Sequence, residues 1–214
     1  MSFSNIGKVW TVETLREYLE GVAIPAHIRG VTVHHTAFPD LVMRPKGFTV
    51  QHMKNIRHGY IHDKGWSAGP HLFVDEDQGF GMTAFTDRGV HAQSFNSTHL
   101  GVELLGDFDR LAEAESERGV AVIRNGAKMV AVLLDKLGLD VGSLNYHRDD
   151  PQTDKTCPGR NFPDRDFRAM VSGFQSNQLA EPPGRNSVLS RLRDRLELLD
   201  AERRDLAEII RRIS

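Results

Sequence analysis

Hydrophobic residues recur at helical spacing in several parts of the chain. The clearest case is residues 117–137, where apolar side chains three or four positions apart predict one face of an amphipathic helix: Val120, Ile123, Ala127, Val130, Leu134 and Leu137. Three shorter segments are also predicted to be helical: residues 14–19, 50–58 and 164–174. The helix over residues 50–58 is expected to end before GWSAGPH, because glycine and proline break helices.

Short apolar runs bounded by glycine or polar residues predict the strands. They cover residues 27–37, 71–75 and 99–106. Strands that alternate with helices are typical of an α/β domain. We therefore expect residues 1–174 to form one α/β domain, in which a mixed central β-sheet is flanked by helices.

The composition of the chain changes after residue 174. Residues 175–187 are polar and contain Pro-Pro-Gly, which predicts a linker. Over residues 188–214, the positions that would face a partner helix follow one another at alternating spacings of three and four. They are apolar except for one arginine: Leu189, Leu192, Leu196, Leu199, Arg203, Leu206, Ile210 and Ile213. This heptad pattern predicts an amphipathic C-terminal coiled-coil helix, and we expect it to form a homo-oligomer. The alternative is a single helix that docks on its own domain.

Composition and charge narrow the range of partners. The chain has 214 residues, of which 39% are apolar and 26% charged, as in a folded globular protein. A net charge of -2 provides no basic surface for nucleic acid, and the single cysteine excludes an internal disulfide. The N-terminus lacks a signal-peptide pattern, and no apolar run is long enough to span a membrane. We therefore expect cytoplasmic synthesis without a signal peptide, no membrane insertion and no nucleic-acid partner.

Two adjacent histidines lie near the end of the first predicted strand. Adjacent side chains of a strand point to opposite faces, so only one of the two can point into a given site. His34 shares its face with Thr32 and Thr36, whereas His35 shares its face with valines. The more polar face favours His34 as the residue for chemistry. The alternative is an ordinary histidine at a strand end.

A second candidate segment is the polar stretch NYHRDDPQTDKTCPG, at residues 145–159. It contains His147 and the only cysteine, Cys157. Together with His34, these side chains supply the nitrogen and sulfur ligands that zinc prefers, and three protein ligands leave a fourth tetrahedral position for water. The spacing between His147 and Cys157 is not itself a zinc signature. A thiol that only fills space before a turn is therefore the alternative.

Four segments occur in the order and approximate spacing of a known enzyme family: VTVHHTA, GWSAGPHLFVD, NSTHLGVELLGDFD and HRDDPQTDKTCPG. Over residues 28–170 the chain resembles the zinc-dependent N-acetylmuramoyl-L-alanine amidases of type 2, a peptidoglycan-recognition-protein-like family. Phage lysozyme-type amidases and a cytosolic anhydromuropeptide amidase belong to that family. The resemblance implies Zn²⁺ as the cofactor, with His34, His147 and Cys157 as its ligands. It also implies a catalytic position for Lys155.

The general base of this family differs between members. Some members place a tyrosine immediately before the histidine of the HLFVD segment, where this chain has Pro70, which has no proton to move. Others use a glutamate in the segment that matches LGVELLG, where this chain has Glu103. The resemblance therefore implies that Glu103 is the base and later the acid, while Lys155 stabilises the oxyanion. The alternatives are a salt-bridged strand glutamate and a solvated loop lysine.

Substrate contacts are also implied by the resemblance. The segment GVHAQSFN matches a part of the family that lines the cleft, which gives His91, Ala92 and Asn96 as expected contacts. His71, which follows Pro70, is a further expected contact. Ordinary loop polarity is the alternative for all of them.

The resemblance implies hydrolysis of the amide between the lactyl group of N-acetylmuramic acid and L-alanine, with peptidoglycan or muropeptides as partners. We expect a phage- or prophage-type endolysin or a particle-associated hydrolase, which acts on the cell wall if another protein releases it. A cytosolic amidase that recycles muropeptides is an alternative. Two alternatives from other classes are a non-catalytic peptidoglycan receptor and a scaffold whose coiled coil is the function.

Overall fold

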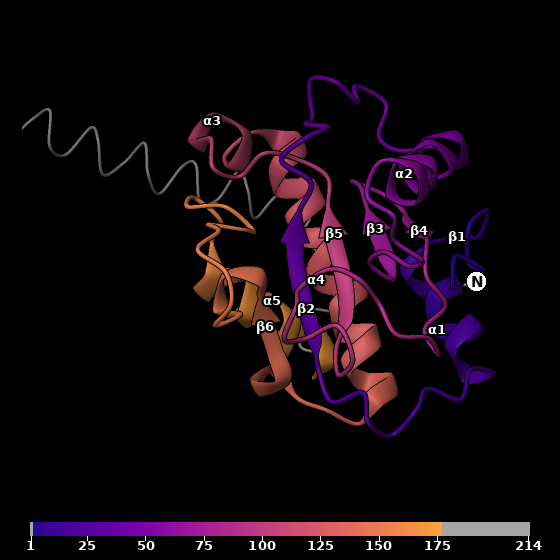
Figure 1. The fold of residues 1–214 in the computed structure, drawn as a ribbon. Helices are drawn as coiled ribbons and strands as arrows, with labels where there is room; N and C mark the ends of the chain where they lie inside the picture. Colours follow the sequence, from indigo (N-terminus) through magenta and orange to yellow (C-terminus); the bar gives the residue numbers. More distant parts are fainter. Residues whose placement is uncertain (1, 177–214) are drawn as a thin grey trace, which may run out of the picture. The chain divides into compact units, whose positions relative to one another are not determined.

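A mixed sheet of six strands, in the order β1-β4-β3-β5-β2-β6, forms the centre of the fold (Figure 1). The computed structural model describes residues 2–176. The strands are β1 Val9–Trp10, β2 Val31–His35, β3 Leu72–Val74, β4 Gly79–Gly81, β5 Leu100–Leu104 and β6 Leu144–Tyr146. Neighbouring strands among β3, β5, β2 and β6 pair in parallel, whereas β4 pairs antiparallel with both β3 and β1.

Helices cover the sheet. They are α1 Val12–Glu20, α2 Val50–His62, α3 Leu111–Ala114, α4 Glu117–Leu137 and α5 Asp164–Gln175. The long helix α4 packs on β2, β3 and β5, with α1 and α5 beside it (Figure 1). Helix α2 contacts β4 and lies toward the opposite side of the sheet, where it contributes to the cleft described below. The mixed sheet flanked by helices confirms the predicted fold class for the part of the chain that the structure describes.

Helix α4 has the bounds that its hydrophobic spacing predicts, and its two ends explain why. The hydroxyl of Ser116 accepts the backbone N–H of Gly119 and caps the N-terminus. Gly138 ends the helix with a φ of 67°, in the left-handed region that glycine adopts without strain. Gly126 lets the helix approach the sheet closely, because a Cβ there would lie 2.5 Å from a methyl carbon of Leu104.

Alternation along the parallel strands gives the sheet two different faces. Leu100, Val102 and Leu104 of β5 are fully buried on the side covered by α4. Gly101 and Glu103 point to the other side, because successive side chains of a strand alternate. Burial of the leucines and valines on the α4 side supplies the main hydrophobic stabilisation of the domain.

Several elements differ from the sequence predictions. Strands β2, β3 and β5 are shorter than the predicted segments, and α2 continues to His62 rather than ending at residue 58. Strands β1, β4 and β6 and helix α3 were not predicted. The polar segment 145–159 is buried at both ends and exposed in the middle: its first residues complete β6, Tyr146, His147 and Cys157 are buried, and residues 151–155 are mostly exposed.

The predicted C-terminal elements lie outside the described residues. Gln175, the first residue of the predicted linker 175–187, is the last residue of α5. The predicted coiled-coil helix over residues 188–214 and its homo-oligomer remain predictions. Within residues 2–176, no helix has the length and the apolar composition needed to cross a bilayer.

Candidate metal centre and catalytic cleft

The register of three parallel strands brings the candidate side chains into one row. His34 of β2 pairs with Glu103 of β5. On the other side, Val33 of β2 pairs with Tyr146 of β6, so that His147, the next residue, follows β6 beside His34. Side chains in register on parallel strands point to the same face. Glu103, His34 and His147 therefore lie side by side on the face opposite α4.

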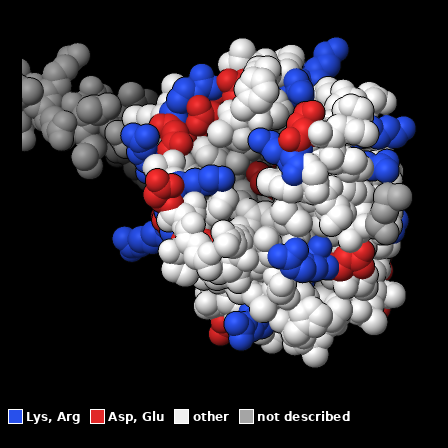
Figure 2. Space-filling view, viewed as in Figure 1, with Lys and Arg blue, Asp and Glu red and all other residues white. Residues whose placement is uncertain are grey.

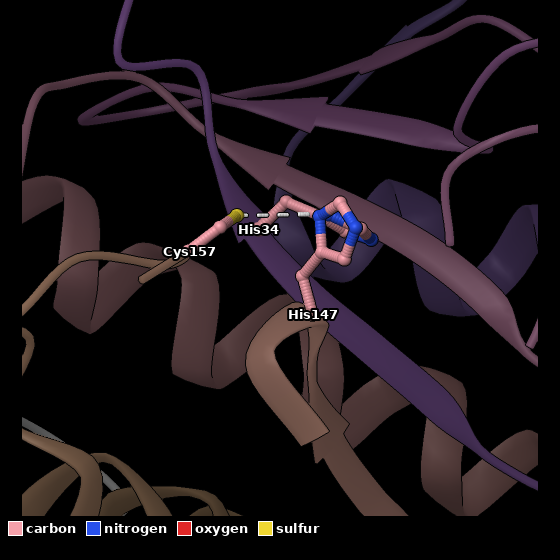
Figure 3. Close-up of side chains that lie close together, drawn as sticks. All are labelled: His34, His147 and Cys157. Carbon is pink, nitrogen blue, oxygen red and sulfur yellow. Dashed lines mark hydrogen bonds between the residues drawn. The ribbon is translucent and has the colours of Figure 1, made fainter. Parts of the chain in front are cut away.

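Three ligand atoms converge at this row, from β2, from the end of β6 and from the following loop (Figure 3). The Nδ1 atom of His34 lies 3.0 Å from Nδ1 of His147 and 3.8 Å from Sγ of Cys157. Around one tetrahedral zinc ion, two nitrogen ligands are about 3.4 Å apart and a nitrogen and a sulfur about 3.6 Å apart. The donor set and its spacing therefore fit zinc.

The loop that carries Cys157 is held in place by hydrogen bonds on both sides. The backbone N–H of His35 donates to Sγ of Cys157 over 3.4 Å. The guanidinium of Arg148 donates to the carbonyls of Thr156 and Gly159, at 3.1 and 2.8 Å. These bonds explain how a polar stretch of sequence positions a thiol that is only 8% exposed.

The two adjacent histidines of β2 have different surroundings. The side chain of His34 belongs to the ligand cluster, whereas Nδ1 of His35 accepts the backbone N–H of Phe108 over 3.0 Å. The ring of His35 also stacks on the ring of Phe108, with centroids 6.1 Å apart. The structure therefore places His34 at the ligand cluster and gives His35 a role in holding the turn after β5.

Burial sets the protonation states of the three ligand residues. It lowers the pKa of His147 to about 4 and lowers the pKa of His34 well below the usual range. Burial also raises the pKa of the Cys157 thiol. Without an ion, both imidazoles are neutral and keep a lone pair for a metal, and the thiol keeps its proton. Metal binding therefore requires that the thiol lose its proton.

Glu103 stands beside the cluster in an apolar environment. Burial raises the pKa of Glu103 to about 8, and the positive charge of Lys155 partly opposes that shift. Phe73 of β3 pairs with Glu103 in the sheet and lines the same cleft. Lys155 lies on the opposite wall, on the exposed loop before Cys157. A carboxyl that titrates near neutral pH next to a metal ligand set is suited to proton transfer.

The cleft has a volume of about 530 Å³ and two unlike walls. Its hollow opens on the face of the molecule shown in Figure 2, with charged side chains around the rim. One wall carries the ligand cluster, Lys155 and Asp109. The other is apolar and comes from α2, the segment after it, β3 and the loop before His91: Ile56, Tyr60, Trp66, Pro70, Phe73 and Val90.

Tyr60 is a cleft residue that the sequence did not reveal. Its ring lies against Trp66, with centroids 5.2 Å apart, and a Cβ at Gly69 would lie 2.6 Å from it. Burial and the nearby charge of Glu103 raise the pKa of the Tyr60 phenol. Nothing in the pattern of α2 distinguishes Tyr60 from a core residue, because its place in the cleft depends on how α2 packs.

Three of the predicted substrate contacts, His71, Ala92 and Asn96, lie outside the lining of the cleft, and their role as contacts stays a prediction. His71 is 0% exposed, and its ring bonds the backbone N–H of Gly101 over 2.9 Å and the carbonyl of Asp87 over 3.0 Å. The side-chain oxygen of Asn96 accepts the N–H groups of His91 and Ala92, at 2.7 and 3.0 Å.

The side chains of His71 and Asn96 instead satisfy backbone groups, His71 those of Gly101 and Asp87 and Asn96 those of its own loop. His91 does line the cleft, and its Nδ1 atom lies 3.1 Å from Nε2 of His34. Of the four expected contacts, His91 alone is therefore in a position to meet a ligand or a metal ligand.

Comparisons with known proteins agree with this geometry. A family model described as N-acetylmuramoyl-L-alanine amidase matches residues 25–160. A search of curated proteins gives no match. Among solved structures, the endolysin amidase LysCS of Clostridium intestinale is 22% identical, with a TM-score of 0.51 over 70% of this chain and 88% of its own.

Two further solved structures are similar to the same extent. A mutant endolysin from Bacillus subtilis is 18% identical, with a TM-score of 0.51, and the match covers 68% of this chain and 86% of that one. Drosophila PGRP-LB is 21% identical, with a TM-score of 0.51 over 70% of this chain and 89% of its own. At these identities the likeness shows a shared fold.

Proposed function

Because the chain belongs to the N-acetylmuramoyl-L-alanine amidase family, we propose that it is a zinc-dependent hydrolase of peptidoglycan. The bond that it cleaves is the amide between the lactyl group of N-acetylmuramic acid and L-alanine. One observation carries this proposal. The ligand cluster of His34, His147 and Cys157 lies in one cleft with a carboxyl of raised pKa, Glu103, and a cation, Lys155.

Zinc bound by the three ligands would polarise the scissile carbonyl and lower the pKa of a bound water toward about 7. Glu103 accepts the proton of the attacking water, whose oxygen forms a bond with the lactyl carbonyl carbon. Glu103 then returns that proton to the nitrogen of L-alanine as the carbon–nitrogen bond breaks. The second proton of the water leaves the new carboxyl group and is taken up by the amine, so the products are a lactyl carboxylate and the ammonium form of L-alanine, and the reaction consumes one water and no other reactant.

Lys155 contributes charge rather than a proton in this scheme. Lys155 lines the cleft two residues before the cysteine ligand, and its charge acts on Glu103, His34 and His147. A cation at this place would stabilise the negative charge that develops on the carbonyl oxygen. The same cation lowers the pKa of Glu103 and thereby favours the carboxylate that acts as base.

The biological role that we propose is that of an endolysin-type or particle-associated cell-wall hydrolase. Two similar structures carry the name endolysin, which supports this role. Recycling of soluble muropeptides uses the same chemistry, so the substrate's size separates the two roles. A cell-wall hydrolase releases peptides from intact sacculi, whereas a recycling enzyme acts only on soluble fragments.

Mass spectrometry of purified peptidoglycan tests the proposal. The protein is incubated with sacculi and, separately, with soluble muropeptides, with and without a chelator. We expect stem peptides that begin with a free L-alanine amine, and glycan strands with free lactyl carboxylates, only in the absence of chelator. Intact peptidoglycan that pellets with the protein would instead indicate a receptor, and products in the presence of chelator would exclude zinc dependence.

A further inference from the structure

His91 lies between the ligand residue His34 and a backbone carbonyl. Its Nδ1 atom is 3.1 Å from Nε2 of His34, on the side of that ring away from the ligand cluster. Its own Nε2 atom is 3.2 Å from the carbonyl oxygen of His99. The rings of His91 and His34 meet edge to face, at an interplanar angle of 86°. The carbonyl of His99, the ring of His91 and the ring of His34 therefore form a chain of contacts that ends at the metal centre.

The fold reserves space for the ring of His91. A Cβ at Gly101 of β5 would lie 2.6 Å from Cγ of His91, and a Cβ at Gly89 would lie 2.9 Å from Cδ2. The backbone N–H of His91 donates to Asn96 over 2.7 Å. Two glycines and one hydrogen bond thus fix where this imidazole stands, independently of any ligand.

The chain of contacts determines where the protons are. A carbonyl oxygen can only accept, so Nε2 of His91 carries the hydrogen of its ring. In a neutral imidazole that carries its hydrogen on Nε2, the other nitrogen, Nδ1, has no hydrogen and is an acceptor. The Nδ1 atom of His91, which carries no hydrogen, accepts a hydrogen bond from Nε2–H of His34. The remaining nitrogen of His34, Nδ1, is then bare and faces His147 and Cys157.

His147 has no comparable support. Among the hydrogen bonds of residues 2–176, its ring takes part only in the 3.0 Å contact between its Nδ1 and Nδ1 of His34. That contact joins two atoms of the candidate ligand set, whose spacing fits one shared metal ion, so it fixes no tautomer for His147.

We propose that His91 is a positioning residue that fixes the tautomer of His34 for metal binding, and that it does not primarily contact substrate. This inference rests on the metal centre of the proposed function. Outer partners of a metal-bound histidine orient its ring and increase its basicity, and their loss typically costs about 10- to 100-fold in metal affinity. The polar contact of His91 is thus made with a ligand residue rather than with the sugar or peptide.

The first test is nitrogen NMR of the metal-free wild-type protein, since nitrogen shifts distinguish the two imidazole tautomers. We expect the Nε2–H tautomer for both His34 and His91. A proton on Nδ1 of His34, or a mixture of its two tautomers, would overturn the proposal. This readout needs no variant and no catalysis, so it is informative even if the protein proves not to be an amidase.

The second test compares zinc affinities by competition with a chromophoric chelator. His91→Phe keeps a ring of similar shape without an acceptor and should weaken zinc binding about 10- to 100-fold. His91→Asn places an oxygen near the position of Nδ1 and should restore most of that loss. His27→Phe, the same substitution at an exposed histidine, should leave affinity unchanged.

Two outcomes of this comparison overturn the proposal. One is a folded His91→Phe protein that binds zinc as tightly as wild type. The other is an Asn variant as weak as the Phe variant while both unfold at the same temperature in chelator. If the wild type itself binds no zinc, the proposed function fails, whereas the tautomers of His34 and His91 still decide this inference.

Discussion

Strand β5 presents Leu100, Val102 and Leu104 to helix α4, and it presents Gly101 and Glu103 to the cleft on the other side of the sheet. Both faces come from the same five residues, because side chains of a strand alternate. The α4 face consists of apolar groups that need no partner other than each other. The cleft face consists of titratable groups, each of which needs a hydrogen bond, a charge or a metal.

The difference separates what stabilises the fold from what performs the chemistry. On the α4 face, burial is favourable by about 25 cal/mol for each Å² of apolar surface. On the cleft face, burial disfavours charge, which raises the pKa of Glu103 to about 8 and lowers the pKa of His71 and His147 to about 4. The cleft face therefore gains reactivity and contributes less stability.

The largest expected effect tests this difference with substitutions of the two adjacent histidines of β2. His34→Asn should abolish stoichiometric zinc binding and reduce hydrolysis to background, because a tetrahedral site loses one of three protein ligands. His35→Asn should keep both, since a side-chain oxygen can still accept the N–H of Phe108. Zinc content and peptide release measure the effect. His35 also borders the cleft, so equal losses in the two variants would show that its ring, too, is needed for zinc binding or hydrolysis.

Glu103→Gln removes the proposed base and leaves the shape of the cleft. We expect kcat to fall by about 10²- to 10⁴-fold, as for the loss of a general acid–base group. Zinc content and the unfolding temperature should not fall, because Glu103 is not a ligand in the cluster. Full turnover in a zinc-loaded variant would show that another group moves the proton.

A substitution on the α4 face should lower the stability of the fold and leave zinc binding and activity unchanged. Leu100→Ala removes a fully buried side chain and should lower the free energy of unfolding by about 2–5 kcal/mol. Zinc affinity and kcat, measured well below the unfolding temperature, should remain those of the wild type. Urea unfolding and steady-state kinetics check the two halves of this prediction, and a large fall in kcat would contradict it.

The sequence was sufficient where local pattern decides the structure. Helix α4 follows from apolar spacing, a serine cap and Gly138, all of which act within one or two turns. The polar face of β2 follows from alternation alone. The family resemblance supplied the remaining candidates, and the structure brings His34, His147, Cys157, Glu103 and Lys155 into one cleft.

Tertiary packing decides the features that the sequence did not reveal. Strands β1 and β4 have two and three residues, too few for a periodic pattern. Strand β6 begins in a polar segment and exists because β2 offers a free edge. Residues 91–96 are as polar as a binding loop, yet Asn96 turns inward to hold its own backbone, which no spacing in the sequence predicts.

The last expected effect is a pH dependence of stability, to which the buried histidines on the cleft side of the sheet contribute most. Burial lowers the pKa of His71 and His147 to about 4 and of His91 to about 3, against about 6.5 in an unfolded chain. Between these values the unfolded state binds more protons than the folded state. The contribution of these three histidines to the stability of the metal-free protein should therefore decrease as pH falls from about 6.5 to 4. Glu103, whose pKa is raised to about 8, contributes a smaller change of the opposite sign, which is lost as pH rises through 8.

Two variants assign that slope to the cleft face when unfolding is measured in chelator at several pH values. His71→Asn keeps an acceptor for the N–H of Gly101 but no longer titrates. It should reduce the slope by up to about 1.4 kcal/mol per pH unit, the value for one proton. Leu100→Ala should lower the free energy of unfolding by the same amount at every pH and leave its slope against pH unchanged. A wild-type curve that is flat from pH 7 to 4.5 would mean that these histidines take up as many protons in the folded protein as in the unfolded chain, which contradicts their lowered pKa values.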